Sequence, residues 1–207
     1  MHLTTIFLFL ISGSFYYSLI YKTNKRSAWD FLTGRMRHVK VIVKKYDKQM
    51  LVWEGFRKEG KIKIPKDIIV FEFETLYNHP KNLIEDGYTI VNTSWTPLYA
   101  VYGGVKNKMA QRAVWSPERI FKWNKWRWEH FSKSVPGYKP IQLKETPQVI
   151  GGQMCSWEQS GEAEIPVLRK RLPVFSERVW NNKPLSLIHI SEPTRQAEMS
   201  YAVFCLK

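Results

Sequence analysis

The chain has 207 residues and a formal net charge of +14, with 32 basic residues against 18 acidic ones. It contains nine tryptophans, and this combination keeps nucleic-acid binding by phosphate contacts and base stacking open as one function. The sequence has no Cys/His cluster at zinc spacing and no glycine-rich phosphate loop. We therefore expect neither a metal nor a cofactor.

Residues 1–28 form an apolar segment for which three hypotheses stay open. Leu3–Tyr21 has the length of a membrane anchor, since roughly 20 apolar residues span a bilayer. A secretory signal usually carries its positive charge before the apolar run, but here the basic residues follow it (Lys22, Lys25 and Arg26). The third hypothesis is non-native read-through. A membrane association is therefore doubtful, and the segment fixes no cellular location.

Strands and helices are expected to alternate through residues 29–184. Trp29–Tyr46 is ambiguous, because its valines alternate as in a strand although the segment has helical length. Further strands are expected at Gln49–Trp53, Ile68–Phe73, Thr89–Thr93 and Val149–Met154, helices at His79–Asp86, Ser116–Phe131 and Glu164–Val179, and loops at Gly55–Lys66 and Val135–Pro147. This alternation predicts an α/β fold with a parallel sheet and right-handed crossovers.

The segment Ser116–Phe131 combines tryptophans with lysines and arginines. Its start, Ser-Pro-Glu, is typical of a helix N-terminus. On a helix, Trp123, Trp126 and His130 would share one face. We therefore favour packing of this face against the sheet, with the lysines in solvent, over a nucleic-acid patch.

Three apolar runs each end in a tryptophan that is followed by polar, turn-forming residues. These tryptophans are Trp53, Trp95 and Trp157. In a (β/α)₈ barrel the active site lies at the carboxyl ends of the strands. An indole ring offers a flat apolar surface to a pyranose, and one N–H donor. One such tryptophan is more often core, but three at equivalent places favour a sugar-binding wall.

These runs also carry a resemblance to a known family. VIGGQMCSWEQ, followed by EIPVLRKRLPVFSERVWN, resembles the last strand and helix of glycoside hydrolase family 20, with the pattern G-G-x-x-C-x-W and then E-R-x-W. LVWEGF resembles the fifth strand of that family, and GYTIVNTSWTPLY its seventh. IIVFEFE is a weaker match to the sixth, because the family usually has a tryptophan where this chain has Glu72 and Phe73.

The resemblance covers the chain from about Trp29 to Pro184 and implies a partial (β/α)₈ TIM barrel. It corresponds to roughly strands 5–8 with their helices, because eight strand–helix units need about 250 residues. It also favours a helix for Trp29–Tyr46. The missing N-terminal half of the barrel would then be a partner of this chain.

The family resemblance implies a β-N-acetylhexosaminidase. In that family the 2-acetamido oxygen of the substrate attacks the anomeric carbon, a glutamate protonates the leaving oxygen, and the preceding aspartate orients the acetamide. The Asp-Glu pair stands at the end of the fourth strand. The only adjacent acid pair of this chain is Glu85-Asp86, in reversed order. We therefore expect the 207-residue polypeptide to be inactive alone.

The resemblance also implies roles for individual residues around an N-acetylhexosamine-containing glycan. Trp53, Trp95 and Trp157 would line the pocket for the N-acetyl group and the sugar ring. Tyr99 is the candidate to hold the acetamide carbonyl, with packing against the barrel as the alternative. An acid often follows the last tryptophan, and here Glu158 and Gln159 stand at and beside that position, so either could bind sugar hydroxyls.

Three other residues have structural expectations. Glu54 is either a supporting residue of the site or an ordinary loop residue. Arg178 is expected in a salt bridge or as a cap on carbonyl groups. Cys155 is expected to be a small buried hydrophobe, because no histidine stands with it in a catalytic arrangement.

Residues 185–207 are expected to be non-native. LSLIHISEPTR and SYAVFCLK both resemble in-frame translations of sequencing adapters. Removing this tail leaves Cys155 as a single cysteine and excludes a disulfide framework within the rest. A second function stays open beside the hexosaminidase: a non-catalytic, basic, Trp-rich module that binds glycans or nucleic acid.

Overall fold

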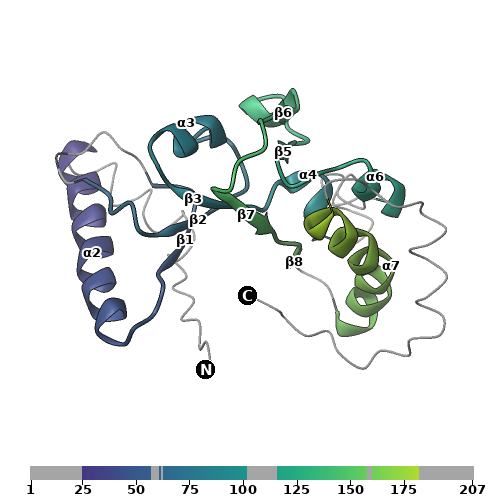
Figure 1. The fold of residues 1–207 in the computed structure, drawn as a ribbon, viewed down its shortest axis with the longest axis horizontal. Coiled ribbons are helices and arrows are strands. Elements are labelled where there is room, and N and C mark those ends of the chain that lie inside the picture. The colour runs from purple at the N-terminus through teal and green to yellow at the C-terminus, as the bar shows by residue number, and fades with distance from the viewer. Residues whose placement is uncertain (1–24, 57–60, 62, 102–115, 158–159, 182–207) are drawn as a thin grey trace. The chain divides into compact units, whose positions relative to one another are not determined.

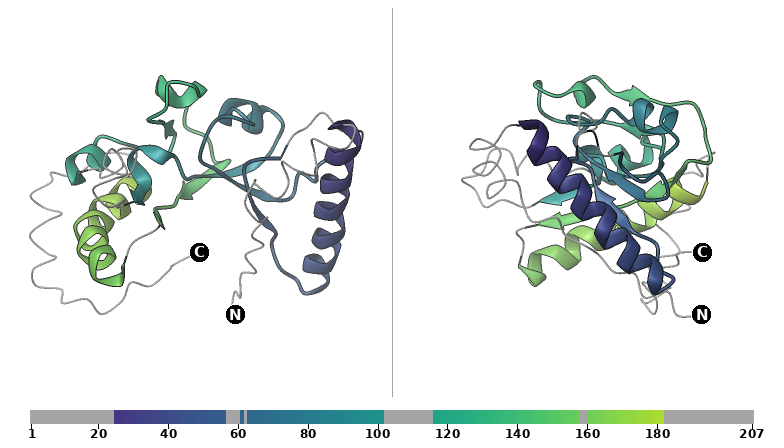
Figure 2. Two further views of the ribbon diagram at one scale, coloured as in Figure 1. Left: turned by 180° about the vertical axis from the view of Figure 1, so that it is seen from behind. Right: turned by 90° about the vertical axis from the view of Figure 1, so that its left-hand side faces the viewer.

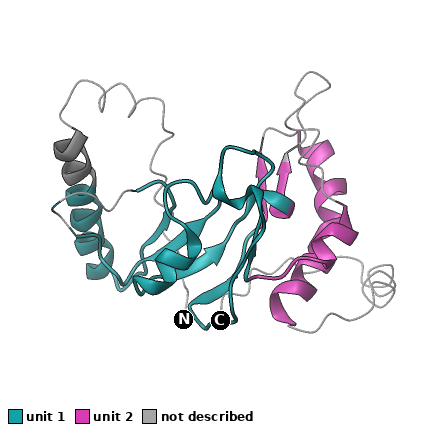
Figure 3. Ribbon diagram, turned by 90° about the horizontal axis from the view of Figure 1, so that it is seen from above, with its two compact units in different colours: residues 1–96, 126–153 teal, residues 97–125, 154–207 magenta. Residues whose placement is uncertain are grey.

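The computed structural model describes residues 25–56, 61, 63–101, 116–157 and 160–181 (Figure 1). The chain divides into two compact units (Figure 3). Unit 1 comprises residues 1–96 and 126–153, and unit 2 comprises residues 97–125 and 154–207.

Unit 1 is built on a parallel sheet of four strands. The strands are β1 (Leu51–Trp53), β2 (Ile69–Glu72), β3 (Thr89–Asn92) and β7 (Val149–Gly152), and they are neighbours in that order. All three pairings are parallel. The four predicted strands are thus confirmed with ends shifted by one or two residues, and so is the α/β class with a parallel sheet.

One row of aliphatic side chains crosses the whole sheet. Val52, Val70, Ile90 and Val149 are paired in register across the four strands and are at most 2% exposed. Met36 and Val43 belong to the same core cluster. Since successive residues of a strand point to opposite faces, the next row lies on the other face of the sheet. That row contains Trp53, Phe71 and Val91.

The first described helix is α2 (Lys25–Lys45), which Figure 2 shows from two further sides. Its packing residues Met36, Val39 and Val43 are spaced by three and four positions, so they lie on one helical face, while Val41 is 58% exposed. The helix expected from the resemblance is therefore confirmed, and the valine alternation was misleading. Within the described ranges, no helix is both long and apolar enough to cross a membrane.

The short helix after β2 is α3 (Pro80–Glu85). His79 caps its start, because the imidazole Nδ1 accepts the N–H of Lys81 at 3.2 Å. Gly87, two residues beyond the helix, has φ +84°, a conformation that favours glycine. Both ends of this predicted helix are confirmed.

The predicted long helix Ser116–Phe131 is wrong. The helix α6 covers only Pro117–Phe121, with Ser116 as its N-cap. β5 (Arg127–Trp128) then pairs antiparallel with β6 (Ile141–Gln142). The carbonyl of Trp126 accepts the N–H of Leu143 at 2.9 Å, so this stretch bonds to another segment instead of to its own next turn.

The packing of that stretch was nonetheless expected correctly. Trp123, Trp126 and Trp128 are at most 7% exposed. The segment Val135–Pro147, predicted as loop, also contains the 3-10 helix η1 (Pro136–Tyr138) in addition to β6.

Unit 2 contains a two-stranded parallel sheet that the sequence did not predict. β4 (Tyr99–Val101) follows the short helix α4 (Trp95–Leu98), and it pairs with β8 (Cys155–Trp157). The helix α7 (Gly161–Trp180) begins three residues before the predicted start at Glu164, because Ser160 caps it by accepting the N–H of Ala163 at 3.4 Å. Pro166 therefore lies inside α7 and not in its first turn.

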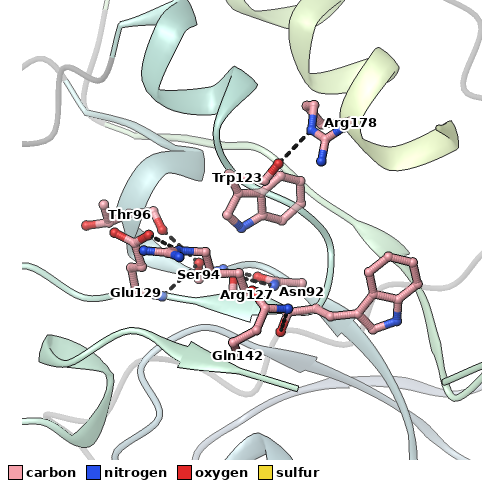
Figure 4. Close-up of polar contacts among 9 residues, drawn as sticks. Asn92, Ser94, Thr96, Trp123, Arg127, Glu129, Gln142 and Arg178 are labelled. Carbon is pink, nitrogen blue, oxygen red and sulfur yellow. Dashed lines mark hydrogen bonds and ion pairs between the residues drawn. The ribbon is translucent and has the colours of Figure 1, made fainter. Parts of the chain in front are cut away.

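Helices α6 and α7 of unit 2 pack through aromatic and backbone contacts. The rings of Trp123 and Phe175 stack at 6.0 Å between centroids. Arg178 donates from Nε to the carbonyl of Trp123 at 2.7 Å (Figure 4). It also donates from Nη1 to the carbonyl of Asn181 at 3.4 Å. Its predicted role as a carbonyl cap is confirmed.

Candidate functional site

The carboxyl ends of the four parallel strands lie at one edge of the sheet in unit 1. Trp53, Glu72, Asn92 and Gly152 are the last residues of their strands. In α/β proteins this edge carries the ligand site, because the loops that follow the strands meet there. The loops after β1, β2 and β3 are therefore the candidate site within this unit.

Trp53 stands at this edge as the centre of an aromatic cluster. Its ring is half-buried, lies 5.5 Å from the ring of Phe71, and meets Phe73 edge-on at 5.6 Å. The three aromatic residues come from the ends of two neighbouring strands, so the sheet itself sets their spacing. A partly exposed indole that is supported by two other rings suits stacking on a sugar.

Asn92 organises the turn that leaves β3 (Figure 4). Its side-chain oxygen accepts the N–H of Ser94 at 2.9 Å, and its Nδ2 donates to the carbonyl of Arg127 at 2.9 Å. Asn92 is fully buried, so both of its polar functions are satisfied inside the protein. The amide thereby ties the turn after β3 to strand β5.

Ser94 and Thr96 continue this connection on the far side of the turn. The hydroxyl of Ser94 donates to the carbonyl of Thr96 at 2.9 Å and accepts the N–H of Glu129 at 3.4 Å. The N–H of Thr96 donates to the carbonyl of Glu129 at 3.1 Å. Glu129 forms an ion pair with Arg127 (Figure 4). The residue between Ser94 and Thr96 is Trp95, whose backbone is therefore fixed on both sides.

The Trp95 ring is half-buried and meets two rings from the segment after β5. It is edge-on to Phe131 at 5.1 Å and to His130 at 6.0 Å. Burial lowers the pKa of His130 to about 4, so the imidazole is neutral at physiological pH. Its Nδ1 accepts the N–H of Ser132 at 2.9 Å, which places the ring proton on Nε2.

The remaining predicted site residues belong to unit 2 or lie outside the described residues. Trp157 ends β8 and is 46% exposed. Tyr99 is only 4% exposed, as the packing alternative expects, while the role of its hydroxyl stays a prediction. Glu158 and Gln159 lie outside the described residues.

Cys155 is paired in register with Tyr99. Burial raises the pKa of its thiol to about 12, and a hydrogen bond with Tyr99 offsets only part of this effect. A thiol with this pKa is protonated at neutral pH and is a poor nucleophile. The expectation of an inert, buried cysteine is therefore confirmed.

The sequence did not reveal that Glu54 and Glu72 are both buried beside the loop after β2. Glu54 accepts backbone N–H groups of Glu74 at 3.2 Å, Tyr77 at 2.8 Å and Asn78 at 2.9 Å. Glu72 accepts the N–H of Thr75 at 2.7 Å. Burial raises the pKa of both carboxyls, that of Glu72 well above its usual range. An acid inside an apolar strand was the only available signal.

Within the described ranges, no group of three or more histidine, cysteine or acidic side chains has an arrangement that could hold a metal ion.

Comparison with known families identifies the class of this fold. The family model described as "Glycosyl hydrolase family 20, catalytic domain" matches residues 16–183. The chain therefore belongs to glycosyl hydrolase family 20. The catalytic domain of this family is a TIM barrel. The resemblance carried by the tryptophan-bearing strands is thereby confirmed.

Solved structures of this family share the fold at low sequence identity. Dispersin B is 14% identical with a TM-score of 0.55, over 78% of this chain and 50% of its own. The β-N-acetylhexosaminidase of Bacteroides fragilis NCTC 9343 is 13% identical with a TM-score of 0.56, over 87% and 36%. The exo-β-N-acetylglucosaminidase of Vibrio harveyi, in complex with N-acetylglucosamine, is 15% identical with a TM-score of 0.53, over 87% and 28%.

The chain thus spans half or less of the length of each of these structures. At these identities the likeness shows the fold alone. A comparison with curated proteins gave no match.

Proposed function

We propose that this chain supplies the sugar-binding half of a β-N-acetylhexosaminidase barrel. In this proposal β1, β2, β3 and β7 are the fifth to eighth barrel strands, and residues 29–184 form the corresponding half domain. Membership of family 20 supports the proposal. The strand order supports it too, because the four strands lie side by side in the sheet in the same order as along the chain. The observation that carries it is Trp53, half-exposed at the carboxyl edge of the sheet.

The complete enzyme would remove terminal N-acetylhexosamine residues with retention of configuration. The acetamido oxygen of the substrate would act as the nucleophile, so the protein needs to orient this group and exclude water. Trp53, Trp95 and Trp157 would stack around the ring and the N-acetyl group. The Tyr99 hydroxyl would hold the acetamide carbonyl, and Glu158 or Gln159 would bind sugar hydroxyls.

The polypeptide alone would bind sugar without cleaving it. Its sequence holds no Asp-Glu pair to protonate the leaving oxygen and to orient the acetamide. General acid catalysis typically contributes about 10²- to 10⁴-fold. Turnover would therefore need a second polypeptide segment that brings the acid pair to the same edge of the barrel.

A basic, Trp-rich nucleic-acid-binding module is the second candidate, and the burial of its tryptophans weighs against it. Trp123, Trp126 and Trp128 lie in the richest basic stretch, but their rings are in the protein interior. Buried rings offer no platform for base stacking. The net charge of +14 is then the remaining support for this candidate.

Titration with N-acetylglucosamine, followed by NMR, tests the proposed function. We expect binding that Trp53→Ala weakens about three- to tenfold, the usual worth of an aromatic stacking contact. Trp180→Ala is the matched control, because Trp180 is 65% exposed near the end of α7. Hydrolysis of an aryl N-acetylglucosaminide by the chain alone should be undetectable.

Three results would contradict this assignment. They are an absence of sugar binding, equal effects of the two tryptophan substitutions, and cleavage by the chain alone. Salt separates the second candidate from the first. Nucleic-acid affinity falls steeply as salt rises, whereas stacking on a neutral sugar barely responds.

A further inference from the structure

The loop Phe73–Asn78, which follows β2, is held by acid side chains from two neighbouring strands. Glu54 comes directly after β1, and Glu72 is the last residue of β2. Together they accept four backbone N–H groups within six consecutive residues of the loop. Both carboxyls are at most 5% exposed, so water does not replace these bonds.

The two carboxyls differ in the way each is used. Glu54 receives three N–H groups, which stabilise a negative charge. Glu72 receives one N–H on Oε1, while its Oε2 is buried and accepts no hydrogen bond in the described part of the chain. Burial raises the pKa of both carboxyls, and the neighbouring charge of Glu54 raises that of Glu72 further. This asymmetry places the negative charge on Glu54 and the proton on Glu72.

The loop also contains a backbone conformation that needs external support. Thr75 has φ +61°, which is rare for a β-branched residue. Its N–H is held by Glu72, and its hydroxyl accepts the N–H of Gly137 at 2.8 Å. Such strained residues persist only where their surroundings determine them.

The first loop residue connects this arrangement to the candidate sugar site. Phe73 meets the Trp53 ring edge-on at 5.6 Å, and Glu54 is the residue after Trp53. Glu72 follows Phe71 and therefore points to the opposite face of β2 from the Trp53 cluster. The two acids act on Trp53 through the backbone rather than by touching a sugar.

We propose that Glu54 and Glu72 together fix the loop Phe73–Asn78 through its backbone N–H groups and so position Phe73 against Trp53. Both are positioning residues. The consequence for sugar binding rests on the proposed function, whereas the hold on the loop does not. Glu72 also stands where the resemblance to family 20 is weakest.

Two isosteric substitutions separate the roles of the acids. Glu72→Gln keeps an acceptor for the N–H of Thr75 and carries no charge, so it imitates the protonated acid. Glu54→Gln removes the charge and turns one acceptor oxygen into a donor. Hydrogen bonds to charged groups are worth about 1.5–3 kcal/mol, so losing one corresponds to about ten- to a hundredfold faster local opening.

Amide hydrogen exchange of the 207-residue chain measures this opening directly. With Glu54→Gln, protection factors at Tyr77 and Asn78 should fall at least about tenfold, and with Glu72→Gln they should change less than about twofold. The amides of Val70 and Ile90, in the sheet core, report whether each variant remains folded. Similar loss in both variants, or no loss with Glu54→Gln, would overturn the proposal.

The pH dependence of loop protection can be measured on the parent chain, so this test does not require a variant to fold. The titratable group that acts on the pair from the loop is Glu74. Because the folded pKa of Glu72 is raised above 4.5, the stabilisation is complete below that pH and is lost as pH rises through the folded pKa. Protection of the loop should therefore fall on raising the pH, and Glu72→Gln should reduce this fall, leaving the part that comes from Glu54.

Carboxyl ¹³C NMR of the parent chain completes the test. Glu72 should carry its proton at neutral pH while Glu54 is ionised, and the reverse assignment would refute the pair as described. Adding N-acetylglucosamine then distinguishes the two proposals. If the loop behaves as expected but the chain binds no sugar, the proposed role of Glu54 and Glu72 stands and the proposed function is rejected. Sugar binding that Glu54→Gln leaves intact would reject the link to Trp53.

Discussion

The loops after β2 and β3 leave the same edge of the same sheet, but different chemistry holds them. Carboxyl oxygens of Glu54 and Glu72 bind the backbone of the first loop. The amide of Asn92 and the hydroxyl of Ser94 bind the second (Figure 4). An amide both donates and accepts without titrating, whereas a buried acid needs a proton or a set of donors.

This difference predicts different responses to pH. The loop after β2 should lose stability as pH rises, because both of its acids have raised pKa values. The side chains of Asn92 and Ser94 bind backbone groups of the loop after β3 and of the segment Arg127–Glu129, and these backbone groups do not titrate.

Asn92→Asp should introduce a buried, titrating acid into the loop after β3, as in the loop after β2. It should cause the largest loss of unfolding free energy among the substitutions in this comparison. At neutral pH the new carboxylate would face the carbonyl of Arg127 in a fully buried position. An uncompensated buried charge costs about 3–5 kcal/mol of unfolding free energy. Because the folded pKa of this acid would be raised, the loss should shrink as pH falls. Urea unfolding at several pH values measures it.

Asn82→Asp is the matched control for this experiment, because Asn82 is exposed on α3. A surface change of this kind should stay within about 0.5 kcal/mol. If Asn92→Asp were equally mild, or if its cost were independent of pH, the contrast between the two loops would be invalid.

Gly137→Ala tests whether the two loops can be treated separately. Gly137 donates to the Thr75 hydroxyl and accepts the N–H of His130 at 2.8 Å, so it touches both neighbourhoods. An added Cβ would lie 2.8 Å from the Thr75 hydroxyl oxygen. Overpacking of this kind costs about 1–3 kcal/mol. We expect thermal unfolding at lower temperature, with faster amide exchange confined to the loop Phe73–Asn78.

The control for this steric argument is Gly161→Ala, at the start of α7. An added Cβ meets nothing within 4 Å at Gly161, so this substitution should be neutral or slightly stabilising. Faster exchange around Trp95 in Gly137→Ala would show that the loops respond as one unit, contrary to the comparison.

The sequence predicted the sheet well because the apolar content of its strands is a local property. Each strand is a short apolar run bounded by turn residues, and such a run has few alternatives. Ser116–Phe131 was mispredicted because the start signal of α6 was real, but nothing local marked its end at Phe121. The pairing of β5 with β6 depends on residues far along the chain. β4 and β8 escaped prediction for the same reason.

The candidate site was predictable from the sequence only where the residue type by itself indicates a function. Trp53 and Trp95 could be proposed from the sequence because each large aromatic follows an apolar run that predicts a strand. The functions of Glu54, Glu72 and Asn92 depend on the backbone N–H groups and carbonyls that they meet, and no spacing rule reveals those partners. Glu72 was noticed only as a departure from the family pattern.

His130→Asn should have the smallest effect on unfolding free energy. It is still informative, because the pH response of His130 has the opposite sign to that of Glu72. The folded pKa of His130 is lowered from 6.5 to about 4 by burial, so its stabilisation is complete above pH 6.5 and is lost as pH falls towards 4. Asparagine keeps an acceptor for the N–H of Ser132 but cannot take up a proton. The difference in unfolding free energy between parent and variant should therefore shrink as pH falls through this range.

His38→Asn, on the exposed side of α2, corrects for the general loss of a histidine. If the difference stayed constant or widened on acidification, His130 would titrate freely beside Trp95. The neutral imidazole would then not contribute to holding Trp95 in the loop after β3.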